Sequence, residues 1–157
     1  LGDVYKRQVY VLSATITTPY CLEEKNAWLD KYLPNVDKEH RILMESSAGF
    51  KSLCVPGNYM YKDDNGKYHI KISENDILID DYNKNLEGWE RDGGTAIKAK
   101  NNINHKGLYG ALWNGELIDV TDTADSIAKR LTEIIVSREK GIEESHYNED
   151  DEELEID

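Results

Sequence analysis

Four short apolar runs, separated by stretches of helical periodicity, constrain the fold of this chain more than any other feature. We predict β-strands at Val9–Leu12, Arg41–Met44, Ile77–Ile79 and Thr95–Ala99. Strands that alternate with helices favour a parallel α/β sheet, in which ligands bind at the carboxyl ends of the strands. Ser13 and the pair Asp80-Asp81 each follow one of these strands, so the sequence predicts a site at that edge.

The stretches between the strands carry helix signals. Leucines recur at helical spacing through Tyr20–Leu33, and we expect Thr18 to cap this helix with Pro19 at its first position. A short helix is predicted at Leu86–Arg91. The pair Gly93-Gly94 that follows suits a left-handed C-terminal cap.

The last helix is predicted from an apolar stripe that begins near Thr121–Thr123 and ends at Gly141. Beyond it the composition changes. Residues 141–157 contain nine acids and no Lys or Arg, so they carry most of the net charge of -12 and leave about -3 for residues 1–140. We expect residues 141–157 to be a disordered acidic tail.

An alternating segment interrupts the α/β pattern between Leu53 and Asn75. Its residues alternate around Asn65-Gly66, a pair typical of a type I′ hairpin turn. We interpret it as an inserted antiparallel β-hairpin.

Composition narrows the class of protein. No run reaches the length of a membrane span, so we expect no membrane partner. Cys21 and Cys54 give neither a disulfide framework nor a metal-ligand spacing, and a reducing cytoplasmic location is the default. The body shows no basic stripe, so we expect no nucleic-acid partner.

Three sequence segments carry candidate chemistry. Asp80-Asp81 suits Mg²⁺, which usually takes one or two protein carboxylates, although a helix cap and a loop acid explain the pair equally well. Lys51 lies in a glycine-containing loop and is suited to a phosphoryl group, or is simply solvated. Ser13 either donates its hydroxyl to a phosphate or ends a strand. Asn85 either lines the metal site or, as we favour, caps the short helix.

Taken together, these segments resemble the haloacid-dehalogenase phosphatases. "VYVLSAT" resembles the second motif of that superfamily, "GFKSL" the third and "ILIDDYNKN" the fourth. The resemblance implies that Ser13 and Lys51 bind phosphate, that Lys51 also orients the nucleophile, that Asp80 is the metal ligand and that Asp81 supports it.

A narrower resemblance is to the 5'(3')-deoxyribonucleotidases, carried by "EEKNAWLDKYLP" and "LIDDYNKNLEGWERDGGTAI". It implies an Mg²⁺-dependent phosphomonoesterase acting on nucleoside monophosphates, built on a three-layer Rossmann-like parallel sheet over residues 9–140. A polynucleotide end phosphatase and a non-catalytic phosphate-binding or interaction module are the alternatives.

One departure from the family limits this expectation. The first motif of the superfamily is a strand ending in Asp-x-Asp, and none precedes Ser13. Residues 1–8 resemble a translated adapter sequence, and we expect them to be artefactual or disordered. We therefore expect a fragment without its nucleophile, in which the strands at Val9–Leu12 and Ile77–Ile79 each lack a neighbour and the site residues still converge.

Overall fold

The computed structural model describes residues 8–45, 50–101 and 113–152. Their contacts divide the chain into two compact units. The first comprises Leu1–Asp76 and Glu87–Thr95, and the second comprises Ile77–Leu86 and Ala96–Asp157. Three sheets occur among the described residues, with the strand orders β1-β2, β3-β4 and β5-β6-β7.

The first unit contains a parallel strand pair and one helix. Strand β1 (Val11–Thr15) pairs in parallel with β2 (Arg41–Glu45), and Ser13 lies opposite Leu43. Helix α1 (Cys21–Tyr32) connects them, followed by the 3-10 helix η1 (Lys38–His40). The helix lies where the leucine spacing predicts it, but the predicted cap at Thr18 is wrong. Its N-cap is Tyr20, and no side chain caps it.

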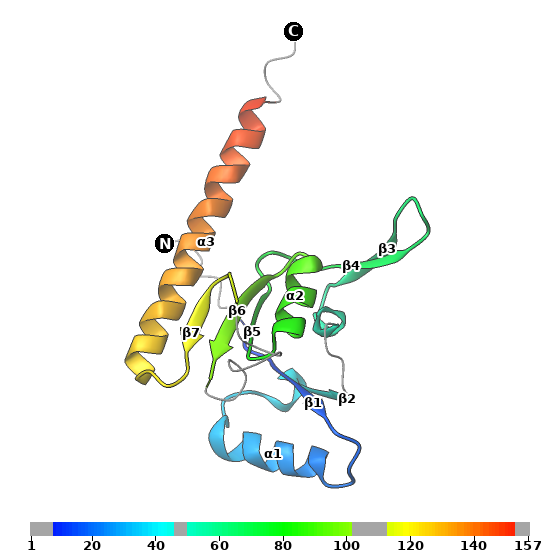
Figure 1. The fold of residues 1–157 in the computed structure, drawn as a ribbon, viewed down its shortest axis with the longest axis vertical. Coiled ribbons are helices and arrows are strands. Elements are labelled where there is room, and N and C mark those ends of the chain that lie inside the picture. The colour runs from blue at the N-terminus through cyan, green and yellow to red at the C-terminus, as the bar shows by residue number, and fades with distance from the viewer. Residues whose placement is uncertain (1–7, 46–49, 102–112, 153–157) are drawn as a thin grey trace. The chain divides into compact units, whose positions relative to one another are not determined.

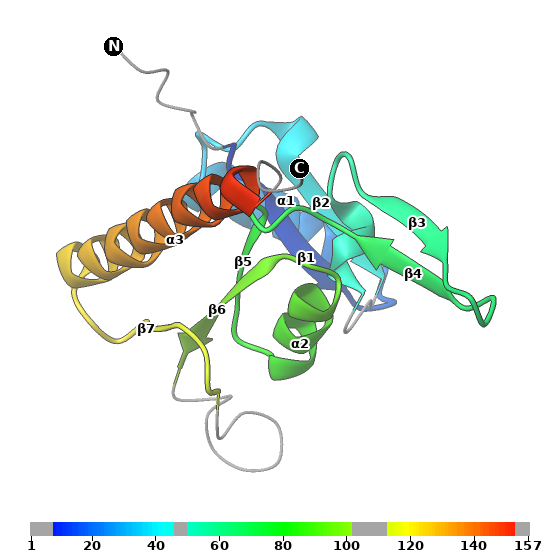
Figure 2. The same ribbon diagram turned by 90° about the horizontal axis from the view of Figure 1, so that it is seen from above.

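The predicted hairpin is confirmed, with a different turn. Strands β3 (Tyr59–Lys62) and β4 (Tyr68–Lys71) pair antiparallel and project away from β1 and β2 (Figure 1, Figure 2). A type I′ turn needs two residues with positive φ, and in this turn only Gly66 has one, at 78°. Asp63 stabilises a longer turn instead, because its Oδ1 accepts hydrogen bonds from the backbone N–H groups of Asn65 and Lys67, each at 2.9 Å.

The second unit is built on the sheet β5-β6-β7. Strand β5 (Ile77–Asp80) neighbours β6 (Thr95–Lys100), which pairs in parallel with β7 (Leu117–Asp119), a strand that the sequence did not predict. The helix α3 (Ala124–Glu152) contacts β7. Ile97, Ile118 and Ile134 form the buried core between these elements. Apolar burial of this kind is the main stabilising force for such a unit.

Helix α2 (Asn83–Arg91) follows β5 and starts three residues before the predicted position. Its end is a Schellman motif: Gly93 N–H donates to Glu90 O at 3.0 Å, and Gly94 N–H donates to Trp89 O at 3.0 Å. Gly93 has φ of 101°, so the predicted left-handed cap is confirmed. Trp89 is buried, and its Nε1 donates to Asp76 O at 2.9 Å, as expected for a core residue.

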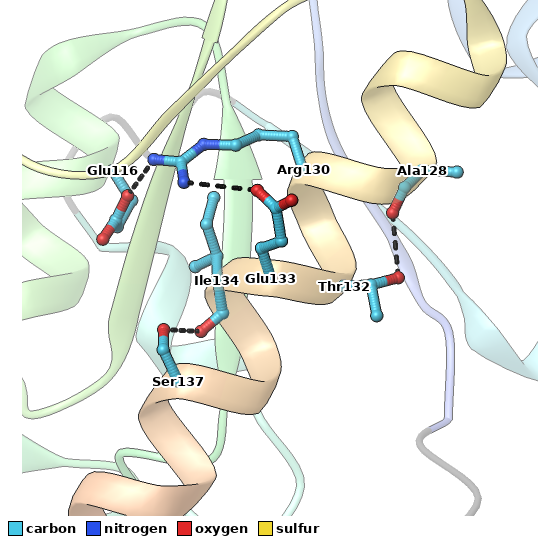
Figure 3. A network of polar contacts seen from close by, with 7 residues as sticks. All are labelled: Glu116, Ala128, Arg130, Thr132, Glu133, Ile134 and Ser137. Carbon is cyan, nitrogen blue, oxygen red and sulfur yellow. Dashed lines mark hydrogen bonds and ion pairs between the residues drawn. The ribbon is translucent and has the colours of Figure 1, made fainter.

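Side-chain contacts hold the first half of α3 in place (Figure 3). Arg130 pairs with Glu116, which precedes β7, at 2.6 Å, and reaches Glu133 one turn along at 4.0 Å. The helix continues to Glu152, so its predicted end at Gly141 is wrong. The reason is local: glutamates are good helix formers and no proline follows Gly141. The disorder of residues 141–157 in solution stays a prediction.

The architecture is mixed α/β with parallel strand pairs, and it is compatible with a Rossmann-like fold. Within the described sheets, β1 has β2 as its single partner and β5 has β6, so both are edge strands. No residue of β1 is fully buried. No helix in the described part of the chain is long and apolar enough to cross a membrane.

Candidate functional site

Two lysines from different elements bond to neighbouring residues of β1. Ser13 is the middle residue of this strand, so its predicted position after the strand is wrong. Lys25 of α1 donates to Ser13 Oγ at 2.7 Å and to Ala14 O at 2.6 Å. Lys51 belongs to the 3-10 helix η2 (Lys51–Cys54) and donates to Leu12 O at 3.0 Å. The structure therefore places Lys51 against the residue that precedes Ser13 and Lys25 on Ser13 itself. Ammonium groups and a hydroxyl are donors suited to an anion with several oxygen acceptors.

A buried carboxylate holds η2 in place. The Ser52 hydroxyl, beside Lys51, donates to Asp92 Oδ2, and both residues are buried. Arg91 donates to both oxygens of the same carboxylate, at 2.8 and 3.0 Å. A buried charge is tolerated when it is paired and hydrogen-bonded in this way. Asp92 therefore fixes the turn that carries Lys51.

Asp80 lies at the end of β5 with its carboxylate turned toward the start of α2. Its Oδ1 accepts the Tyr82 backbone N–H at 2.8 Å, and Asn85 Nδ2 lies 3.2 and 3.1 Å from its two oxygens. The cap that we favoured for Asn85 is wrong, because this residue lies inside α2 and donates to Asp80. An acid at a helix start, bonded to nearby N–H groups, is favourable without any metal.

Asp81 is half-buried and lies in a second set of contacts. Its Oδ2 accepts a hydrogen bond from Asn101 Nδ2 at 3.0 Å. Its main-chain oxygen accepts one from the ammonium group of Lys98 at 2.5 Å, and the same ammonium donates to Asn83 Oδ1 at 2.6 Å. Burial lowers the pKa of Lys98, and the charges of Asp81 and Asp80 oppose that shift.

The donors at this turn fit a magnesium ion in kind. Asp80 and Asp81 supply two adjacent carboxylates, and Mg²⁺ usually binds one or two together with water. Within the described residues, no group of three or more His, Cys, Asp and Glu side chains is arranged to hold a metal. Asp80 and Asp81 are therefore a two-carboxylate donor set of the kind that a hydrated hard cation takes.

The predicted site residues are divided between the two units. Ser13 and Lys51 belong to the first, and Asp80 and Asp81 to the second, so their convergence stays a prediction. Sequence reasoning missed Lys25 and Lys98. Lys25 stood inside the quoted segment "EEKNAW", where its place on a helix that follows the Ser13 strand was the available signal. Lys98 gave no signal, because a lysine within a predicted strand is equally compatible with a solvated side chain.

The comparisons with known proteins give no family. The chain matches no protein-family model, no curated protein and no solved structure. Any assignment of this chain therefore rests on its residues and their geometry.

Proposed function

We propose that this chain is the phosphate- and magnesium-binding part of a phosphomonoesterase of the haloacid-dehalogenase type, with nucleoside monophosphates as substrates. The observation that carries the proposal is that Lys51 and Lys25 bond to consecutive residues of β1: Lys51 to Leu12 O, and Lys25 to Ser13 Oγ and Ala14 O. Ser13 and Lys51 are also the residues that the sequence and its resemblance assign to phosphate.

The three side chains have complementary roles toward a phosphoryl group. Lys25 and Lys51 would neutralise its oxygens, because an ammonium group beside an anion forms a charge-assisted hydrogen bond. The Ser13 hydroxyl, which accepts a hydrogen bond from Lys25, retains its own O–H to donate to a phosphoryl oxygen. Such donors stabilise the charge that develops on phosphorus during transfer.

Asp80 and Asp81 would hold the magnesium ion. When bound, that ion would supply further neutralisation of the phosphoryl charge. The chain itself holds these acids in place: Tyr82 N–H and Asn85 fix the Asp80 carboxylate, and Asn101 fixes that of Asp81.

The nucleophile belongs to a segment that this sequence does not contain. No Asp-x-Asp occurs anywhere in the chain. Within the described sheets, β1 and β5 are each edge strands with a single partner, and an edge strand is able to pair with a further strand. The proposed complete sheet is of the three-layer haloacid-dehalogenase kind.

The test is to restore the parent gene's preceding segment. A chain extended by a strand ending in Asp-x-Asp should hydrolyse nucleoside monophosphates in the presence of Mg²⁺, as measured by phosphate release. Asp80→Ala should abolish this activity. Asp125→Ala, an exposed acid in the first turn of α3, is the matched control and should retain it.

The present chain should bind nucleoside monophosphates without turnover. Phosphate release by this chain above a metal-free blank would show that the nucleophile lies within it. A parent gene with a genuine start codon just before β1, and no Asp-x-Asp strand, would instead favour a non-catalytic phosphate-binding module.

A further inference from the structure

Lys98 is a charged residue in the interior of the second unit. It is 2% exposed and lies in the middle of β6, directly after Ala96 and Ile97, which are 1% and 0% exposed. Lysines are almost never buried to this degree unless they are paired. Its position therefore calls for a specific set of partners.

The ammonium group of Lys98 is held by the turn between β5 and α2 and by the first residue of α2. The ammonium donates to the main-chain oxygen of Asp81 and to the side-chain oxygen of Asn83. These acceptors stand on either side of Tyr82, whose own N–H donates to Asp80. One ammonium thus spans the turn that sets the directions of the Asp80 and Asp81 carboxylates.

The next lysine on the same strand shows a different environment. Lys100 has a side chain that is 43% exposed, and it pairs with Asp119 at 3.0 Å. Exposed pairs of this kind contribute little, whereas loss of a buried charged donor removes strong hydrogen bonds from its acceptors. Lys98 and Lys100 carry the same charge on the same strand but have different partners, so Lys100 serves as the control for Lys98.

We propose that Lys98 is a positioning residue for the carboxylate pair: its buried ammonium fixes the Asp81–Asn83 turn so that Asp80 and Asp81 present their oxygens to a divalent cation. The inference rests on the proposed function, because it assigns these acids to metal binding. Lys98 itself takes no part in coordination.

The experiment measures Mn²⁺ binding to the full chain by electron paramagnetic resonance, with Mn²⁺ as the probe for the magnesium site. Lys98→Met should weaken binding at least tenfold, and Lys98→Arg, which keeps the charge, should recover part of the loss. Asn83→Ala removes one of the two acceptors and should give an intermediate loss. Lys100→Met removes the same charge and should stay within twofold of the wild type.

Each outcome decides between alternatives. If Lys98→Met binds Mn²⁺ as the wild type does, Lys98 serves the fold alone and the inference is wrong. Tighter binding would also overturn it, because Lys98 would then act only as a competing positive charge. If Lys98→Met does not fold, Asn83→Ala and Lys98→Arg decide in its place. If the wild type binds no Mn²⁺, the metal site in the proposed function fails first, and the role of Lys98 fails with it.

Discussion

Replacing Lys25 with methionine removes one of the two ammonium groups that bond to β1. Methionine keeps the length and the apolar stem of the side chain, so the change is confined to the charge and its two hydrogen bonds, to Ser13 Oγ and Ala14 O. We expect the folded state to persist, since Lys25 is only half-buried and lies on the surface of α1. Binding of an anion beside Ser13 should weaken.

The size of the loss follows from the nature of the contact. A hydrogen bond to a charged group contributes about 1.5–3 kcal/mol, and each 1.4 kcal/mol is about tenfold in affinity. Because Lys25 is partly exposed to solvent, the lower end applies, and we expect inorganic phosphate to bind roughly tenfold more weakly. Nucleoside monophosphates should lose a similar factor, because the loss concerns their shared phosphate.

The assay is calorimetric titration with inorganic phosphate and a nucleoside monophosphate at about 0.15 M salt, where charges are screened over about 8 Å. Lys31→Met is the control, since it makes the same change of charge on the same helix. Lys31 lies six residues further along, roughly 9 Å at the helical rise per residue, and its ammonium stands over the Tyr32 ring. Equal losses of phosphate affinity in the two variants would show an effect of net charge and refute a phosphate site at Lys25 and Lys51.

Three further predictions concern stability. Gly94→Ala should lower stability by about 1–3 kcal/mol in denaturant unfolding, because a methyl group there would overlap the Trp89 ring and lie 2.7 Å from Ile72 Cδ1. Gly57→Ala meets no atom within 4 Å, so its cost reports the backbone strain at its φ of 84° alone. Hydrogen bonds from Thr121 and Lys100 lower the pKa of Asp119 to about 2. Its carboxylate therefore stabilises the fold above pH of about 4 and loses that effect as the pH falls toward 2. Asp119→Asn should flatten the decline of the thermal midpoint in that window, and an unchanged decline would contradict this. Deleting residues 141–157 should leave the thermal midpoint unchanged, because Ile134 lies before the deletion and is the buried apolar residue among the described side chains of α3; a clear drop would mean that the acidic segment packs on the folded protein.

Local patterns predicted most of the elements. The strand at Ile77–Ile79 appears as β5, the leucine spacing gives α1, and Gly93-Gly94 caps α2. These succeed because helix periodicity, strand composition and glycine caps depend on residues only a few positions apart. The errors were also local. The conformation of the turn at Gly66 is set by Asp63, whose carboxylate accepts three hydrogen bonds, and α3 continues beyond Gly141.

The sequence by itself determined the order of the candidate residues: a serine in the first strand region, a lysine in a turn and two aspartates where β5 ends. The tertiary structure alone decided which side chains meet them. Lys25 reaches Ser13 across 12 positions, Lys98 reaches Asp81 across 17, and Lys51 reaches Leu12 across 39. No spacing rule predicts such contacts, because they depend on how helices and strands pack against one another. A lysine has the same local signature whether it is solvated or, like Lys98, buried with its ammonium group on the turn that follows β5.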